Sequence, residues 1–235
     1  MSVLEHIGEL RRRLIRVLAV LLVMVVIGLA VARPIILYMK SAAPVENIEW
    51  NVFSPWDTLR IYINVAFLVA LIVSLPYTLY QIWAFMAPGL KPHEKKAALM
   101  YIPFAFILYV TGLAFAYFLV FPMAFYFTTT LTHALQLTET YGIAQYFSFM
   151  FNILLPIGLL FELPVVVMFL TRIGILNPSR MSKMRRYAYL LLVIIATMIT
   201  PPDFISPIIV SLPMILLYEF SVMLSQRVYR KHHIS

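Results

Sequence analysis

The chain has 235 residues, of which 63% are hydrophobic and only 12% are charged, and it contains no cysteine. A soluble domain is about half apolar and about a quarter charged, so this composition excludes a soluble globule and indicates an integral membrane protein. The net charge of +8 comes from short basic clusters between apolar runs, a pattern that sets membrane topology and does not indicate nucleic-acid binding.

Apolar runs long enough to cross a membrane recur along the whole chain. A spanning helix needs about 20 apolar residues, and the runs lack the period-two alternation of membrane strands. Six spans are predicted, at residues 14–37, 61–86, 97–121, 149–171, 187–200 and 206–224. Because no polar stretch exceeds about 20–25 residues, we expect residues 1–235 to form a single all-α membrane domain.

The last two predicted spans are the shortest. The 14 residues of the fifth span would reach about 21 Å, against about 30 Å of hydrocarbon. Either the bilayer thins there or the last two helices form a hairpin that barely crosses; alternatively, Pro201 and Pro202 simply end the helix. Prolines inside spans kink helices, and five of them predict a concave cup in place of a straight bundle. These prolines are Pro76, Pro103, Pro156, Pro164 and Pro213.

The basic residues indicate an orientation. With six spans both termini lie on one side of the membrane, and that side carries 15 of the 18 Lys and Arg residues. Since cytoplasmic loops are enriched in Lys and Arg, we expect both termini and the loops at 91–96 and 172–186 to be cytoplasmic. The chain is therefore predicted to be a multi-pass protein of the cell membrane.

Sequence signatures of enzymes are missing. There is no G-x-S-x-G elbow, no Walker loop and no G-x-G-x-x-G fingerprint. The stretch HEKKA at residues 93–97 begins like the zinc motif H-E-x-x-H, but Ala97 stands where the second histidine must be. We therefore expect neither enzymatic activity nor a metal or cofactor.

Two acidic residues fall on the predicted cytoplasmic face. Glu9 lies in the amphipathic stretch EHIGELRRRL, four residues before Arg13, so a surface ion pair is its simplest interpretation. Glu94 precedes Lys95 at the start of the third span, where the helix dipole favours a carboxylate. Both carboxylates share one membrane face, where a cationic ligand could meet them together.

A third acidic residue lies inside a span. Glu162 is the only charged residue of LLPIGLLFELPVVVMFL, residues 154–170. A carboxylate that faces hydrocarbon costs about 2.5–3.5 kcal/mol on insertion scales, so such residues usually serve a function. The alternative is a packing role, with Glu162 hydrogen-bonded to a neighbouring helix.

Six stretches resemble one known family. They are HIGELRRRL, FMAPGLKPHEKK, GLAFAYFLVFP, FELPVVVMFLTRIGI, TPPDFIS and LLYEFS, in this order between residues 6 and 221. They are similar to the TatC family, the multispanning subunit of the twin-arginine protein translocase, and most like versions from Gram-positive bacteria. The resemblance implies a protein that binds twin-arginine signal peptides of folded precursor proteins. It also implies small single-span partners of the TatA/TatB type, self-association, and transport driven by the proton motive force.

The resemblance also implies roles for individual residues. Glu9 and Glu94 match the family's acidic positions that read the two arginines, and Arg11, Phe85 and Leu90 match further positions tied to signal recognition. Glu162 matches an intramembrane glutamate expected to face a partly hydrated pocket and to bind a polar group of a partner helix. The other motif residues are Pro88, His93, Tyr117, Pro164, Pro201, Pro202 and Asp203.

Two other classes of protein compete with this interpretation. A secondary transporter could use Glu162 as a proton or cation site, but transporters tend to show repeated halves, and these two halves share no visible motif. An intramembrane enzyme would need a nucleophile or a metal set that the sequence lacks.

Overall fold

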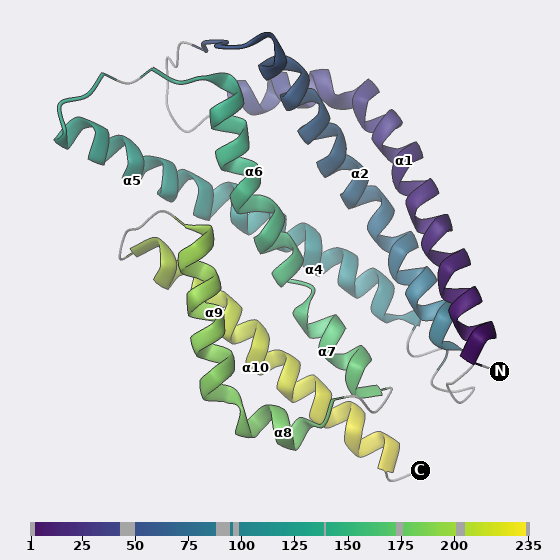
Figure 1. Ribbon diagram of the computed structural model, residues 1–235. Coiled ribbons are helices and arrows are strands. Elements are labelled where there is room, and N and C mark those ends of the chain that lie inside the picture. The colour runs from purple at the N-terminus through teal and green to yellow at the C-terminus, as the bar shows by residue number, and fades with distance from the viewer. Residues whose placement is uncertain are drawn as a thin grey trace. The chain divides into compact units, whose positions relative to one another are not determined.

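The computed structural model describes residues 3–42, 50–87, 95, 99–138, 140–172, 176–200 and 205–233. The chain is helical, as predicted, and its elements are shown in Figure 1. They are α1 (Val3–Ser41), α2 (Pro55–Met86), α4 (Tyr101–Phe115), the π-helix η2 (Ala116–Val120), α5 (Phe121–Ala134), α6 (Ile143–Leu160), α7 (Leu163–Arg172), α8 (Pro178–Lys183), α9 (Arg185–Ile199) and α10 (Ile205–His233).

Five helical segments within the described ranges are long and apolar enough to cross a membrane. They are Ile7–Ser41, Pro55–Met86, Tyr101–Ala134, Ile143–Thr171 and Ile205–Arg227. Each contains or overlaps a predicted span, so the chain is a multi-pass membrane protein. The remaining predicted span, 187–200, corresponds to α9, a helix of only 15 residues. The six-span count and the side on which the termini lie stay predictions.

The helices extend further than the apolar runs that predicted them. The amphipathic stretch around Glu9 and the first span form one continuous helix of 39 residues, α1. The prediction of a short last helix is wrong, because α10 has 29 residues and continues to His233. The predicted span ends at residue 224 because polar side chains follow it. The helix continues because residues 214–233 contain no glycine or proline that would end it.

The prolines divide into two groups. Pro76, Pro156 and Pro213 lie inside α2, α6 and α10, where each removes one backbone hydrogen bond. Pro103 and Pro164 instead lie in the first turns of α4 and α7. A missing N–H costs nothing there, since the first N–H groups of a helix have no partner within it. At Pro164 the predicted distortion of the span is a break between α6 and α7, and at Pro103 it stays a prediction.

The chain forms two compact units, each described here by itself. The first comprises Met1–Phe106 and Tyr141–Ser148, and the second comprises Ile107–Thr140 and Phe149–Ser235. In the first unit, α1 and α2 run antiparallel and pack along their lengths (Figure 1). A Cβ atom placed on Gly28 would lie 2.5 Å from the Ala66 carbonyl oxygen, so the two backbones touch at this point. Small residues allow such close approach between membrane helices.

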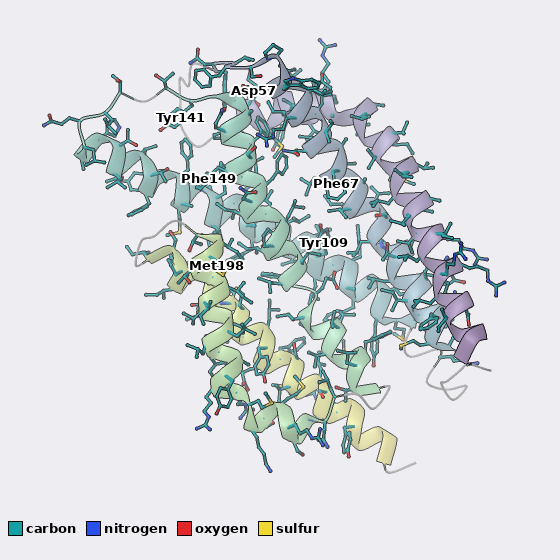
Figure 2. All side chains as sticks on the ribbon, viewed as in Figure 1. Asp57, Phe67, Tyr109, Tyr141, Phe149 and Met198 are labelled. Atoms are coloured by element: carbon teal, nitrogen blue, oxygen red, sulfur yellow. The ribbon has the colours of Figure 1, made fainter. Side chains whose placement is uncertain are left out.

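Hydrogen bonds fix the end of the first unit at which α2 begins. The Asn51 N–H donates to the Tyr141 carbonyl at 3.1 Å, and the Ile143 N–H donates to the Asn51 carbonyl at 2.9 Å. Asp57 closes a capping box at the start of α2 by accepting the N–H groups of Phe53 and Ser54, both at 3.0 Å. Tyr141 and Asp57 are labelled in Figure 2.

In the second unit, α10 packs against α7, α8 and α9 (Figure 1). Val167, Met181 and Val222 form a buried apolar cluster there. The hydroxyl groups of Thr171 and Ser225 lie 2.7 Å apart and join α7 to α10. These contacts hold the C-terminal helices beside the segment that contains Glu162.

Candidate functional site

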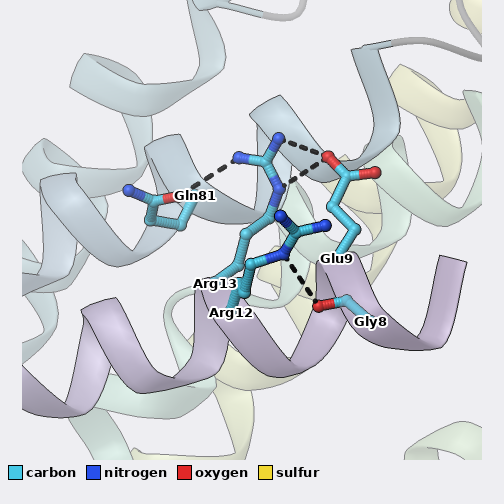
Figure 3. A network of polar contacts seen from close by, with 5 residues as sticks. All are labelled: Gly8, Glu9, Arg12, Arg13 and Gln81. Atoms are coloured by element: carbon cyan, nitrogen blue, oxygen red, sulfur yellow. Dashed lines mark hydrogen bonds and ion pairs between the residues drawn. The ribbon is translucent and has the colours of Figure 1, made fainter. Parts of the chain in front are cut away.

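The first candidate site lies where the start of α1 meets the end of α2 (Figure 3). The Arg13 guanidinium donates to Glu9 Oε1 from Nε at 3.0 Å and from Nη2 at 2.5 Å. Its third nitrogen, Nη1, donates to the amide oxygen of Gln81 on α2 at 3.2 Å, and the Gln81 amide nitrogen donates to the Tyr77 hydroxyl at 2.7 Å. The i,i+4 pair of Glu9 and Arg13, predicted from spacing, is confirmed.

This pair is less exposed than a surface ion pair. The side chains of Glu9 and Arg13 are each 18% exposed. Glu9 Oε2 is buried and has no hydrogen-bond partner among the described residues. An unpaired buried carboxylate oxygen costs more free energy than a paired one, so this atom is suited to a cation or N–H donor from outside the chain.

Other predicted residues surround the same end of the hairpin. Arg11 is exposed on α1, and Phe85 is half-buried in the last turn of α2. The indole N–H of Trp83 donates to the Lys95 carbonyl at 3.1 Å, which ties Lys95 to the end of α2. Glu94 directly precedes Lys95 in the sequence. The predicted residues outside the described part of the chain are Pro88, Leu90, His93, Glu94, Pro201, Pro202 and Asp203.

The second candidate site is Glu162, which lies at a break between two helices. The fourth predicted span is not continuous, because α6 ends at Leu160 and α7 begins at Leu163. The Glu162 N–H donates to the Leu159 carbonyl at 3.1 Å, and the Glu162 carbonyl accepts from Val165 and Val166, each at 3.0 Å. Pro164 has no N–H, so the helical bond to Leu160 cannot form at this position.

The Glu162 side chain is buried beside this break. It is 7% exposed, and neither carboxylate oxygen has a hydrogen-bond partner among the described residues. Tyr109 on α4, labelled in Figure 2, lies within electrostatic range of Glu162 and has a buried hydroxyl that is also unpartnered within the described chain. Among the described residues, therefore, Glu162 forms no side-chain hydrogen bond to a neighbouring helix, as a packing role would require.

The break is held in place by close packing. A Cβ atom on Gly112 of α4 would lie 2.6 Å from Phe161 Cγ, and one on Gly158 of α6 would lie 2.9 Å from Leu113 Cδ2. Tyr117, a predicted motif residue, lies in η2, which directly follows α4. Its ring packs edge-on against that of Phe118, with 5.0 Å between the ring centroids. The two glycine contacts pack α4 against the C-terminal end of α6 and Phe161, on the N-terminal side of Glu162.

Comparison with known proteins identifies the family to which the chain belongs. The family model described as Sec-independent protein translocase protein (TatC) matches residues 5–213. The chain belongs to the TatC family.

Relatives in the TatC family match nearly the whole chain. The Sec-independent protein translocase protein TatC of Halalkalibacterium halodurans is 46% identical over 98% of this chain and 91% of its own length. TatCy of Bacillus subtilis is 40% identical over the same shares of the two chains. A crystal structure of the twin arginine translocase receptor TatC aligns with a TM-score of 0.79 at 30% identity, covering 95% of this chain and 99% of its own.

Membership of the TatC family decides between the competing classes of protein. The relatives and the structure described above are translocase proteins, so the alternative of a secondary transporter has no support from them. The function predicted from the six motifs, a translocase subunit, is confirmed at the level of the family. The roles of single residues stay predictions.

Three residues of these sites were not singled out from the sequence. Gln81 and Tyr77 lie in an apolar stretch of α2, and Tyr109 lies in an apolar stretch of α4. Isolated Gln and Tyr residues are common in membrane spans, where they bond to neighbouring helices or lie at the interface. The only available signal was the spacing of Tyr77 and Gln81 at i,i+4, which places both on one face of a helix.

Proposed function

We propose that this chain is the receptor subunit of a twin-arginine translocase, and that it binds the signal peptides of folded precursor proteins at the end of the α1–α2 hairpin. The observation that carries the proposal is Glu9, whose Oε2 atom is buried and unpartnered within the described chain. The arginine-rich motif of such a peptide supplies what this atom lacks, since guanidinium N–H groups form strong charge-assisted bonds with carboxylates.

A second carboxylate completes the proposed site. Glu94 is joined in sequence to Lys95, whose carbonyl is bonded to Trp83 at the end of α2. Together with Glu9, Glu94 would give the proposed site two acidic residues, one for each arginine of the ligand. Phe85 and Leu90 would contact apolar side chains next to the arginines, and the exposed Arg11 would contact the peptide backbone or a polar residue. This end of the hairpin would face the cytoplasm, as the bias of basic residues predicts.

Glu162 is proposed to contact a second kind of partner. Both of its carboxylate oxygens are buried in a span and unpartnered among the described residues. A polar group on another membrane helix could donate a hydrogen bond to them. A small single-span subunit of the translocase, of the TatA/TatB type, would present such a group on its helix. Hydrogen bonds between membrane helices contribute about 0.6–2 kcal/mol, enough to orient one helix against another. Transport itself would be driven by the proton motive force.

Titration of the purified chain in detergent with a fluorescent twin-arginine peptide tests the proposed receptor function. Glu9→Ala and Glu94→Ala should each weaken binding, because each removes one charged partner of a pair. For partly exposed pairs we expect the lower half of the range of about 2–5 kcal/mol measured for buried pairs. A matched control is Glu219→Ala, which removes an acid from α10 that pairs with Arg185 instead. Unchanged affinity in both single variants and in the double variant would overturn the proposal.

A further inference from the structure

The ion pair between Arg13 and Glu9 is one-sided. Arginine and carboxylate groups commonly pair with one N–H on each oxygen. In this chain both Nε and Nη2 of Arg13 donate to the same oxygen, Oε1, at 3.0 and 2.5 Å. The other oxygen, Oε2, is left without a partner among the described residues. Half of the carboxylate is therefore occupied by the protein itself.

Gln81 accounts for this geometry. Its amide oxygen accepts from Arg13 Nη1 at 3.2 Å, and its amide nitrogen donates to the Tyr77 hydroxyl at 2.7 Å. Gln81 is 5% exposed, so its amide is enclosed as well as bonded at both ends. A fixed acceptor on α2 holds the guanidinium on the α2 side of Glu9 (Figure 3). In that position the guanidinium reaches Oε1 and not Oε2.

We propose that Gln81 and Arg13 are positioning residues, which present the single oxygen Oε2 of Glu9 to the cation of the signal peptide. This inference rests on the proposed receptor function. It has a consequence for selectivity. A single oxygen can accept N–H groups from a guanidinium or from an ammonium, but it cannot form the two-oxygen bidentate pair that favours arginine. Glu9 therefore reads positive charge and discriminates weakly between arginine and lysine, because the planar fork of arginine has no second oxygen to engage.

Two substitutions should change binding in different ways. Gln81→Met keeps the volume of the side chain and removes both hydrogen bonds. The guanidinium of Arg13 is then free to turn and pair with both oxygens of Glu9, which closes Oε2 to the ligand and weakens binding. Arg13→Met leaves both oxygens of Glu9 to the ligand. An arginine can then bind them in the bidentate manner and a lysine cannot, so the preference for arginine over lysine rises.

The experiment uses the full chain in detergent and measures fluorescence anisotropy of a labelled synthetic peptide, in which an Arg-Arg pair precedes an apolar stretch. Companion peptides carry Gln or Lys at one of the two arginine positions. The position read by Glu9 is the one whose Gln replacement has no further cost in the Glu9→Ala chain. Thr78→Val is the matched control on α2, because its hydroxyl bonds to the Ser74 carbonyl of the same helix.

We expect Gln81→Met to weaken binding about fivefold, the equivalent of one net hydrogen bond, and Gln81→Glu, which retains the acceptor for Arg13, to restore it. At the position read by Glu9, lysine should cost the wild-type chain less than about threefold, and Arg13→Met should raise this cost to about tenfold. Gln81→Met should have no further effect in a Glu9→Ala background, since Gln81 and Arg13 affect binding only by positioning Glu9. Thr78→Val should bind as the wild type does.

The outcomes separate the two proposals. If Glu9→Ala binds normally, the positioning inference is wrong; the receptor proposal fails as well only if Glu94→Ala and the double variant also bind normally. If Glu9→Ala weakens binding but Gln81→Met binds as the wild type does, only the positioning role is wrong. An equal loss for Gln81→Met with and without Glu9 would reveal a merely structural role. Should Gln81→Met fail to fold, the selectivity of Arg13→Met decides, because an unchanged cost of lysine overturns the inference.

Discussion

Two glutamates of this chain illustrate how the surroundings of a residue determine its use. One carboxylate oxygen of Glu9 is bonded to Arg13, and the other is buried and unpartnered among the described residues. Glu162 lies inside a span, beside a break in the helix, with both oxygens unpartnered within the described chain. The first arrangement suits a charged ligand that arrives from water. The second suits a polar group that arrives within the bilayer, where water does not compete for the bond.

Glu162 gives a prediction in which stability and activity change in opposite directions. Removing an unpartnered buried polar group relieves a cost of about 1–3 kcal/mol. Glu162→Met, which keeps the side-chain volume, should therefore raise the thermal stability of the purified chain and abolish transport of a twin-arginine precursor in cells. Glu162→Gln keeps hydrogen-bonding capacity and should support most of the transport. If both variants fail alike, transport needs an ionised carboxylate; a less stable Met variant would show that Glu162 has a structural bond.

At the scale of residues, the sequence predicted what depends on local spacing or on composition. The pairing of Glu9 with Arg13 follows from an i,i+4 interval on one helix. Glu162 is conspicuous because no other charge lies between residues 154 and 170. Gln81 could not be predicted, since its role depends on which face of α2 meets α1. That choice is a property of the packed pair and not of either helix alone.

At the scale of elements, apolar runs located the helices but not their breaks and ends. Residues 149–171 read as one span, yet α6 ends at Leu160 and α7 begins at Leu163. The apolar side chains on both sides are equally compatible with a continuous helix. The break follows from Pro164, which lacks an N–H and disfavours the helical conformation of the residue before it. Whether a proline bends a helix or starts a new one depends on tertiary packing, here on Phe161 against Gly112.

The α1–α2 pair depends on its small residues, and two glycines of α1 provide a matched test. A Cβ atom on Gly28 would lie 2.5 Å from the Ala66 carbonyl oxygen, whereas one on Gly8 would meet no atom within 4 Å. Gly28→Ala should therefore destabilise the purified chain by about 1–3 kcal/mol through overpacking. Gly8→Ala should stabilise it by up to about 1 kcal/mol, because alanine favours the helix. The measurement is thermal unfolding in detergent, and equal effects at both positions would contradict the close contact.

At the scale of the whole molecule, family and helical class could be predicted because six motifs and five long apolar segments extend along the entire chain. Topology is less determined, since it depends on α9. This helix has 15 residues, or about 22 Å at 1.5 Å per residue, and a typical hydrocarbon core is about 30 Å thick. Composition alone does not say whether such a helix crosses. If it does, the bilayer around it is thinned or the helix ends lie below the headgroups.

Single cysteines can decide whether α9 crosses, because the chain has no cysteine of its own. The three exposed positions Ser41, Ser179 and Ile205 lie at the end of α1, in α8 before α9, and at the start of α10. With six spans and cytoplasmic termini, a membrane-impermeant maleimide added to intact cells should label Ser41→Cys and Ile205→Cys. It should label Ser179→Cys only after permeabilisation, which also controls for reactivity of that thiol. Labelling of Ser41→Cys alone in intact cells, with Ile205→Cys protected, would mean that α9 does not cross and that the C-terminal end of α10 lies outside. Labelling of Ser179→Cys alone would reverse the orientation, and with it the cytoplasmic position of Glu9 on which the receptor proposal depends.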